Sequence, residues 1–204
     1  MLTFLLSGGF REFILITGSI LVGLPLPLLP AQILWKNIVE DGLPSFALAF
    51  EKGEKDIMKQ KPKNLQKKPL LDNEMKVRIF IISLFTDILL FLLFWWLWQK
   101  TQDLAYVRTM VFAGLTISSL LYIFSIKSFR KNLWNTNLFS NTYLLFSIAV
   151  GWLLLIGAIY FPPLQKILRT EALGLAEWGI LGALGLINIV LIEAVKFFFI
   201  RRND

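Results

Sequence analysis

The sequence contains no cysteine and no histidine. Disulfide bonds, metal sites built on thiolate or imidazole, and acid–base catalysis by histidine are therefore excluded. Any ion that this chain binds must be held by oxygen atoms. Acidic residues are also few, because 14 Asp and Glu stand against 21 Lys and Arg among 204 residues.

Apolar residues dominate the chain, at 56% of the sequence and with a mean hydropathy of +0.64. This composition is typical of an integral membrane protein. A helix rises about 1.5 Å per residue, so a hydrocarbon core of about 30 Å needs about 20 apolar residues. We expect an all-α polytopic membrane protein, a bundle of six transmembrane helices whose second helix is broken. The spans are expected at about 2–22, 27–50, 77–97, 107–126, 141–160 and 173–200.

The basic residues gather in loops between the apolar runs, above all in the lysine-rich loop 51–76. Lys127, Arg130 and Lys131 follow the fourth run, and Arg201 and Arg202 follow the sixth. By the positive-inside rule these loops and both termini face the cytoplasm, and we expect the plasma membrane as the location. The charge of +7 then reflects topology. The lipid bilayer is the expected partner, and nucleic acid is not.

The second apolar run contains ionisable residues where a membrane helix normally has none. Asn37, Glu40 and Asp41 are spaced to share one helix face, and Gly42 and Pro44 interrupt the helix directly after them. An ionisable side chain at bilayer depth costs several kcal/mol and is tolerated mainly beside an ion pathway. The segment therefore predicts a cation site, to which backbone carbonyls freed by the break can add ligands.

Two other interpretations of this segment remain open. The helix is merely kinked and its acids are satisfied by neighbouring groups, or Lys36, one turn before Glu40, forms an internal ion pair with it. Glu12 on the first span lies about 16 Å from the Gly23 turn, at the depth of Asn37, so it can face the cluster. Asp87, in the middle of the third span, is either a second polar contact within the bundle or a hydrogen-bond partner of Thr86 or Ser83, and we favour the structural role.

Residues 24–62, LPLPLLPAQILWKNIVEDGLPSFALAFEKGEKDIMKQKP, closely resemble the sixth membrane helix and following loop of cation-pumping P-type ATPases, in the calcium-pump-like branch. The resemblance continues through RTMVFAGLTISSLLYIFSIKS, like the family's eighth helix, and LGLAEWGILGALGLINIVLIEAVKFF, like its tenth. It implies that the six spans are helices five to ten of such a pump. It also implies a set of residues that coordinate the transported ion, namely Glu12, Asn37, Glu40, Asp41 and, on the eighth helix, Ser119.

The sequence departs from the family pattern at three of these positions. Gly9 stands where calcium pumps usually have asparagine, Glu40 where they have threonine, and Ser119 where the animal calcium pumps have an acid. Calcium prefers six to eight oxygen ligands, so the departures favour one ion or a different ion. In the proton pumps of this superfamily an arginine on the fifth helix pairs with the aspartate of the sixth helix. Arg11 is one residue from the matching position. The implied cargo is therefore calcium or another metal cation, with a proton as the alternative.

The motifs of the catalytic part of such pumps are not in this sequence. We find no DKTGT, no TGE and no GDG-x-ND, so the chain alone has no phosphate acceptor and no nucleotide site. It is expected to act as part of an ATPase only with the missing N-terminal catalytic part, through which ATP and magnesium would act. We interpret it as a C-terminal fragment or a split gene product. The alternatives are a decayed or repurposed, non-catalytic membrane protein that binds a partner, and a passive channel or carrier.

Overall fold

A computed structural model gives the fold and describes residues 2–50, 73–126 and 141–201. Within these ranges the chain forms eight α-helices and no strand, so the expected all-helical class is confirmed. The helices are α1 (Leu2–Leu21), α2 (Pro30–Asp41), α3 (Leu43–Ala49), α4 (Asn73–Thr101), α5 (Leu104–Ile126), α6 (Thr142–Tyr160), α7 (Pro162–Leu168) and α8 (Leu175–Arg201).

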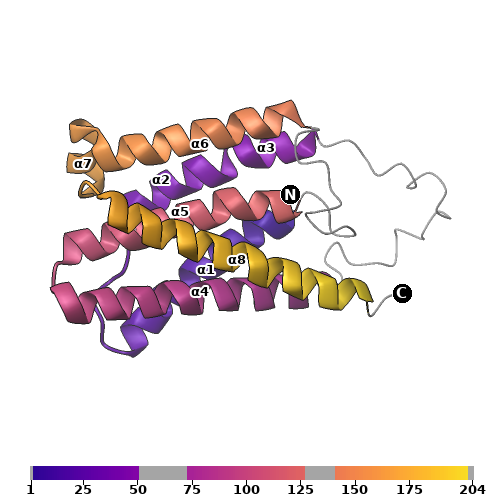
Figure 1. The fold of residues 1–204 in the computed structure, drawn as a ribbon, viewed down its shortest axis with the longest axis horizontal. Coiled ribbons are helices and arrows are strands. Elements are labelled where there is room, and N and C mark those ends of the chain that lie inside the picture. Colours follow the sequence, from indigo (N-terminus) through magenta and orange to yellow (C-terminus); the bar gives the residue numbers. More distant parts are fainter. Residues whose placement is uncertain (1, 51–72, 127–140, 202–204) are drawn as a thin grey trace.

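The long helices run back and forth along one axis and form a bundle (Figure 1). Each of the six expected apolar ranges contains one pass along this axis, and α2 and α3 together make the second pass. The start of α1 and the end of α8 lie at the same end of the bundle, as six passes require (Figure 1). The sequence did not predict α7, a short helix that begins with two prolines. The membrane side that this end faces stays a prediction.

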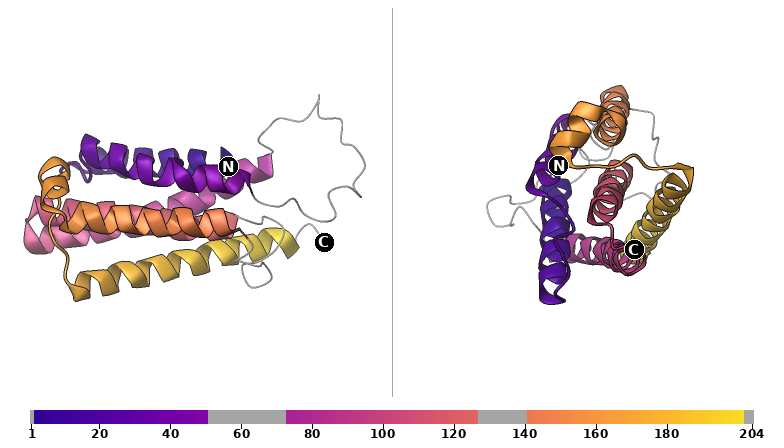
Figure 2. Two further views of the ribbon diagram at one scale, coloured as in Figure 1. Left: turned by 90° about the horizontal axis from the view of Figure 1, so that it is seen from above. Right: turned by 90° about the vertical axis from the view of Figure 1, so that its left-hand side faces the viewer.

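Helix α5 is the central helix of the bundle (Figure 2). Every residue from 109 to 120 is buried. Small residues let the neighbouring helices approach closely. A Cβ atom added at Gly114 of α5 would lie 2.7 Å from a methyl group of Leu90 on α4, and one at Gly185 of α8 would lie 2.8 Å from a methyl group of Leu121. The central position of α5 matters because candidate site residues on α1 and α2 lie against it.

Three of the described helices are long and apolar enough to cross a membrane, at Leu104–Ser125, Thr142–Tyr160 and Leu175–Val195. The two outer ones expose large apolar side chains. Leu153 on α6 is 68% exposed, and Val190 on α8 is 65% exposed. No water-soluble bundle would place so many apolar side chains outside without a partner, whereas contact with lipid chains accounts for them.

The end of the bundle that carries α7 is held together by hydrogen bonds to backbone carbonyls. Gln32 Nε2 of α2 donates to the carbonyl oxygen of Leu168 at 3.0 Å, and Arg108 Nε of α5 donates to that of Leu26 at 2.9 Å. These bonds fix the start of α2 against α5 and α7. They therefore position the later part of α2, where the candidate site lies.

A chain of polar side chains crosses the interior between α4, α8 and α5. Thr86 Oγ1 donates to Asn188 Oδ1 at 2.8 Å, and Asn188 Nδ2 donates to Ser118 Oγ at 3.1 Å. All three residues are buried. Hydrogen bonds between buried side chains hold membrane helices in register because lipid offers no alternative partner.

Replacing Asn188 by leucine should lower the free energy of unfolding by about 1–3 kcal/mol, since the Ser118 hydroxyl then loses its buried donor. The measurement is denaturant titration of the purified chain in mixed micelles, followed by circular dichroism. Val190→Leu, a change on the exposed face of the same helix, should stay within about 0.5 kcal/mol of the wild type. Equal stability of the two variants would contradict the structural role of this network.

Candidate functional site

The second pass through the bundle is interrupted between α2 and α3. α2 ends at Asp41, α3 begins at Leu43, and Gly42 between them has φ −72° and ψ −114°. A Cβ atom at Gly42 would lie 2.5 Å from the carbonyl oxygen of Ile38, a distance that only glycine avoids. The Ser45 hydroxyl donates to the Glu40 carbonyl oxygen at 3.5 Å. The interruption expected from Gly42 and Pro44 is present.

Beside this interruption, one lysine bridges two buried carboxylates. Lys36 Nζ lies 2.7 Å from Glu12 Oε1 and 2.8 Å from Glu40 Oε2. The exposed fractions of the three side chains are 1%, 11% and 2%. The bridge joins α1 to α2 in the interior, where a charged hydrogen bond is strongest and an unpaired charge is most costly.

Two further residues of α1 lie close to this bridge or to the central helix. Arg11 is 2% exposed, and its Nη2 donates to the carbonyl oxygen of Leu115 on α5 at 3.2 Å. A Cβ atom added at Gly8 would lie 3.5 Å from Glu40 Oε2, at ordinary van der Waals distance. Gly8 of α1 therefore lies directly beside the Glu40 carboxylate. The charged groups of α1 and α2 thus converge beside the middle of α5.

The chemistry of the arrangement is that of a cation held by carboxylates. The ammonium group of Lys36 contacts one oxygen of each acid at hydrogen-bonding distance, as a small cation would. The described residues contain no group of three or more acids that could hold a metal ion. The positive group that the structure places between Glu12 and Glu40 is the ammonium group of Lys36.

Comparison with known proteins identifies the family. The family described as "Cation transporting ATPase, C-terminus" matches residues 25–198 of this chain. The chain belongs to this family. The calcium-transporting ATPase of Bacillus subtilis is 35% identical over 178 residues, which are 86% of this chain and 20% of that protein. Calcium-transporting ATPase 1 of Bacillus cereus is 34% identical over 211 residues, 95% of this chain and 23% of that protein.

A human relative shows how widely the likeness extends. Calcium-transporting ATPase type 2C member 1 of Homo sapiens is 30% identical over 191 residues, covering 94% of this chain and 20% of that protein. This chain thus spans about a fifth of the length of the relatives that it matches. The calcium-pump-like resemblance of the sequence is confirmed, and this cation-transporting ATPase C-terminal region is an integral membrane protein.

Of the residues predicted to form the ion site in this ATPase region, the structure brings Glu12 and Glu40 together through Lys36. Asn37 is half-buried on α2. Ser119 is buried on α5, and its hydroxyl has no hydrogen-bond partner among the described residues. Asp41 is the last residue of α2, but its side chain lies outside the described residues. Ion coordination by these five predicted residues stays a prediction.

Two features of the ATPase region escaped the sequence reasoning in part or in full. The pairing of Lys36 with Glu40 was one of the alternatives left open by the sequence, and the structure shows it. The simultaneous contact of Lys36 with Glu12 was not anticipated, although Glu12 was placed at the same depth. Asp87 was assigned a structural role, yet both of its buried oxygens lack a hydrogen-bond partner among the described residues. The sequence signal for this buried carboxylate was the presence of an acid in the middle of an apolar span.

Proposed function

We propose that this chain is the membrane transport domain of an ATP-driven cation pump and supplies part of its intramembrane cation site. The observation that carries the proposal is the match of residues 25–198 to the cation-transporting ATPase family, together with two buried carboxylates, Glu12 and Glu40, beside the interruption at Gly42. Membrane transporters hold ions at such interrupted helices, where side chains and freed backbone groups meet.

In this proposal Glu12 and Glu40 are the principal carboxylates of the site. Asn37, Asp41 and Ser119 contribute further oxygen atoms. The buried Ser119 hydroxyl supports its assignment, because a buried hydroxyl without a hydrogen-bond partner retains two lone pairs for an ion. Asn37 and Asp41 are assigned to the site because they lie three residues before and one residue after Glu40 on α2.

Lys36 acts in this proposal as a tethered cation. Its ammonium group keeps the two carboxylates neutralised and in place, and a transported cation must compete with it for the same oxygens. Such competition keeps the affinity for the ion moderate, and it avoids two unpaired buried charges when the ion leaves. The lysine would therefore set both the charge and the affinity of the site.

The remainder of the pump would supply the chemistry that drives transport. The chain covers about a fifth of its relatives, and ATP and magnesium would bind to the catalytic part, its proposed partner. The chain would lie in the plasma membrane, in contact with the lipid bilayer, with the shared end of α1 and α8 at the cytoplasmic side.

The identity of the cargo divides into two candidates. Calcium is favoured by the relatives, which are calcium-transporting ATPases. A proton or a monovalent cation is favoured by Lys36, which already compensates one of the two negative charges of Glu12 and Glu40. Calcium prefers six to eight oxygen ligands, more than Glu12, Glu40 and Ser119 supply with their side chains.

The test is ATP-driven cation uptake into inverted membrane vesicles that contain this chain joined to the preceding part of the Bacillus subtilis relative. Glu12→Gln and Glu40→Gln should each lower uptake about tenfold or more, a loss of at least ~1.4 kcal/mol in ion binding or transport. Glu171→Gln, which changes an exposed acid between α7 and α8, should leave uptake within about twofold. Calcium, proton and sodium uptake are measured separately.

Three outcomes would overturn this proposal. Uptake that both substitutions leave unchanged would remove Glu12 and Glu40 from the ion site. Flux through the chain without ATP would assign it to a channel or carrier. If ATP hydrolysis by the joined protein does not depend on any transported ion, this chain is a non-catalytic membrane protein.

A further inference from the structure

A third buried acid, Asp87, lies in the middle of α4 and takes no part in the Lys36 bridge. Its side chain is 1% exposed, and neither carboxylate oxygen has a hydrogen-bond partner among the described residues. Thr86 donates to Asn188 instead, and the side chain of Ser83 lies outside the described residues. The hydrogen bond that the sequence led us to expect for Asp87 is not observed in the described part of the chain.

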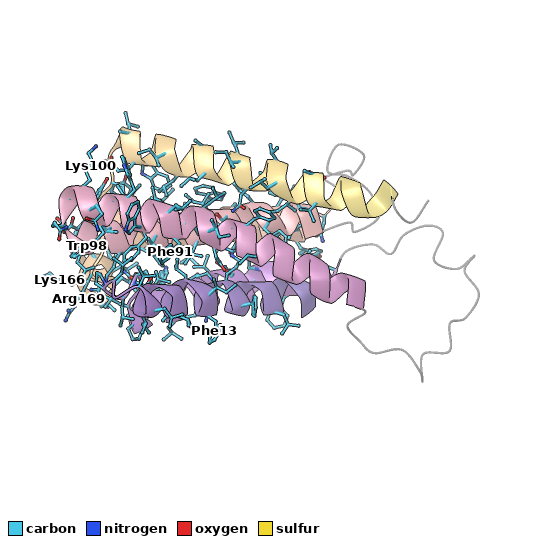
Figure 3. The ribbon with its side chains drawn as sticks, turned by 90° about the horizontal axis from the view of Figure 1, so that it is seen from below. Phe13, Phe91, Trp98, Lys100, Lys166 and Arg169 are labelled. Atoms are coloured by element: carbon cyan, nitrogen blue, oxygen red, sulfur yellow. The ribbon has the colours of Figure 1, made fainter. Side chains whose placement is uncertain are left out.

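Asp87 borders an apolar groove between α1 and α4. The groove has a volume of about 290 Å³, and Asp87 is the single polar side chain among the residues that line it. Figure 3 shows α1 and α4 side by side, with Phe13 on the outer side of α1. The Phe91 ring fills part of the gap, 3.6 Å from where a Cβ atom of Gly18 would lie. The groove therefore offers Asp87 no partner from the protein.

The charges that act on Asp87 come from α1 and from the Lys36 bridge. The positive charges of Arg11 and Lys36 both act on its carboxyl group. On α8, Glu193 is buried and has an interaction of its own. The charged and titratable side chains on the described elements around Asp87 are Arg11 and Glu12 of α1, Lys36 and Glu40 of α2, Tyr106, Arg108 and Tyr122 of α5, and Glu177 and Glu193 of α8.

The charges of this buried cluster do not balance. Among the described side chains of the cluster, Glu12, Glu40 and Asp87 carry three negative charges when ionised, and Arg11 and Lys36 carry two positive ones. One negative charge remains, and burying it uncompensated costs several kcal/mol. A buried carboxyl group avoids this penalty by binding a positive charge or a proton.

A proton fits the surroundings of Asp87 better than a metal ion does. A metal cation requires several oxygen ligands, whereas the groove provides one carboxyl group and the neighbouring Thr86 hydroxyl donates to Asn188. A proton requires one oxygen. We propose that Asp87 is a proton-binding residue of the intramembrane site and holds a proton while Lys36 bridges Glu12 and Glu40.

The proton on Asp87 is linked to the Lys36 bridge through charge. Ionised Asp87 needs compensation, and the available cations are the side chains of Arg11 and Lys36. A cation that displaces Lys36 from Glu12 and Glu40 frees the ammonium group to compensate Asp87, so the proton leaves. This role in transport rests on the proposed function, whereas the protonation of Asp87 does not.

The test is infrared spectroscopy of the purified chain in lipid vesicles at neutral pH, without ATP and without the catalytic part of a pump. Wild-type chain should show the C=O band of a protonated carboxyl group, and Asp87→Asn should lose it. Glu171→Gln, which changes an exposed acid, should keep it. Wild-type chain labelled with ¹³C in the aspartate carboxyl groups should show the band shifted, which tests the assignment without a substitution.

A second arm tests the charge balance itself. Glu40→Gln removes one negative charge from the cluster, so the band should disappear at a lower pH than in the wild type. Absence of the band from the wild type, its persistence in Asp87→Asn, or no isotope shift would overturn the proposal. A band that behaves as expected beside a failed uptake assay would overturn the pump function and leave the proton site intact.

Discussion

Replacing Lys36 by methionine is expected to lower the free energy of unfolding by about 3–5 kcal/mol, because removal of one partner leaves buried charges uncompensated. The change deprives both Glu12 and Glu40 of the ammonium group that lies within 2.8 Å of each. Methionine keeps much of the length of the lysine stem, so the loss reports on charge more than on a cavity. Denaturant titration in mixed micelles at neutral pH measures it.

The matched controls separate charge from packing. The triple variant Glu12→Gln, Lys36→Met and Glu40→Gln has no buried charge in the bridge and should recover most of the loss. Lys100→Met changes an exposed lysine whose ammonium group lies 5.0 Å from the Trp96 ring, and should cost less than about 1 kcal/mol. If Lys36→Met were as stable as Lys100→Met, the bridge would have no role in stability.

The same variant can identify the ion. In Lys36→Met the two carboxylates are without their tethered cation, so a free cation that fits the site should raise the melting temperature as its concentration rises. Wild-type chain should respond far less, because the ammonium group competes for the same oxygens. Titrations with calcium, sodium and potassium, and with acid, compare the candidates directly.

The helices and the interruption could be predicted because their signals are local. Long apolar runs specify spans, and Gly42 with Pro44 terminates α2 regardless of what packs against it. The contact of Lys36 with Glu40 is equally local, since residues four apart lie on one helix face. The short helix α7 escaped prediction because its seven residues carry no long periodic pattern.

The contacts between helices could not be predicted, because they depend on how the bundle packs. We expected α1 to lie against α2, its neighbour in sequence, but α1 packs most extensively against α4. Lys36 nevertheless reaches Glu12 because its long side chain spans the distance between helices. The groove beside Asp87 and the hydrogen bonds of Asn188 arise from the same packing.

Substituting Gly42 by alanine is expected to destabilise the chain by about 1–3 kcal/mol, since the added methyl group overlaps a backbone atom and forces the helices apart. The clash is with the Ile38 carbonyl oxygen, 2.5 Å from the Cβ position, and backbone yields less easily than a side chain. Relief requires a change in the turn between α2 and α3, which carries Glu40 with it. In the joined pump, ATP-driven uptake should therefore fall about tenfold or more, equivalent to ~1.4 kcal/mol.

Gly182→Ala provides the control for this substitution within the same protein. Gly182 lies inside α8, and apart from the adjacent backbone of its own helix no atom lies within 4 Å of its Cβ position. Alanine there should stabilise the helix by about 0.5–1 kcal/mol, because glycine is the weaker helix former. The two variants add the same methyl group. If Gly42→Ala lowers the free energy of unfolding while Gly182→Ala raises it, the loss at position 42 comes from the interruption itself. A Gly42→Ala chain as stable and as active as Gly182→Ala would show that the site does not depend on this turn.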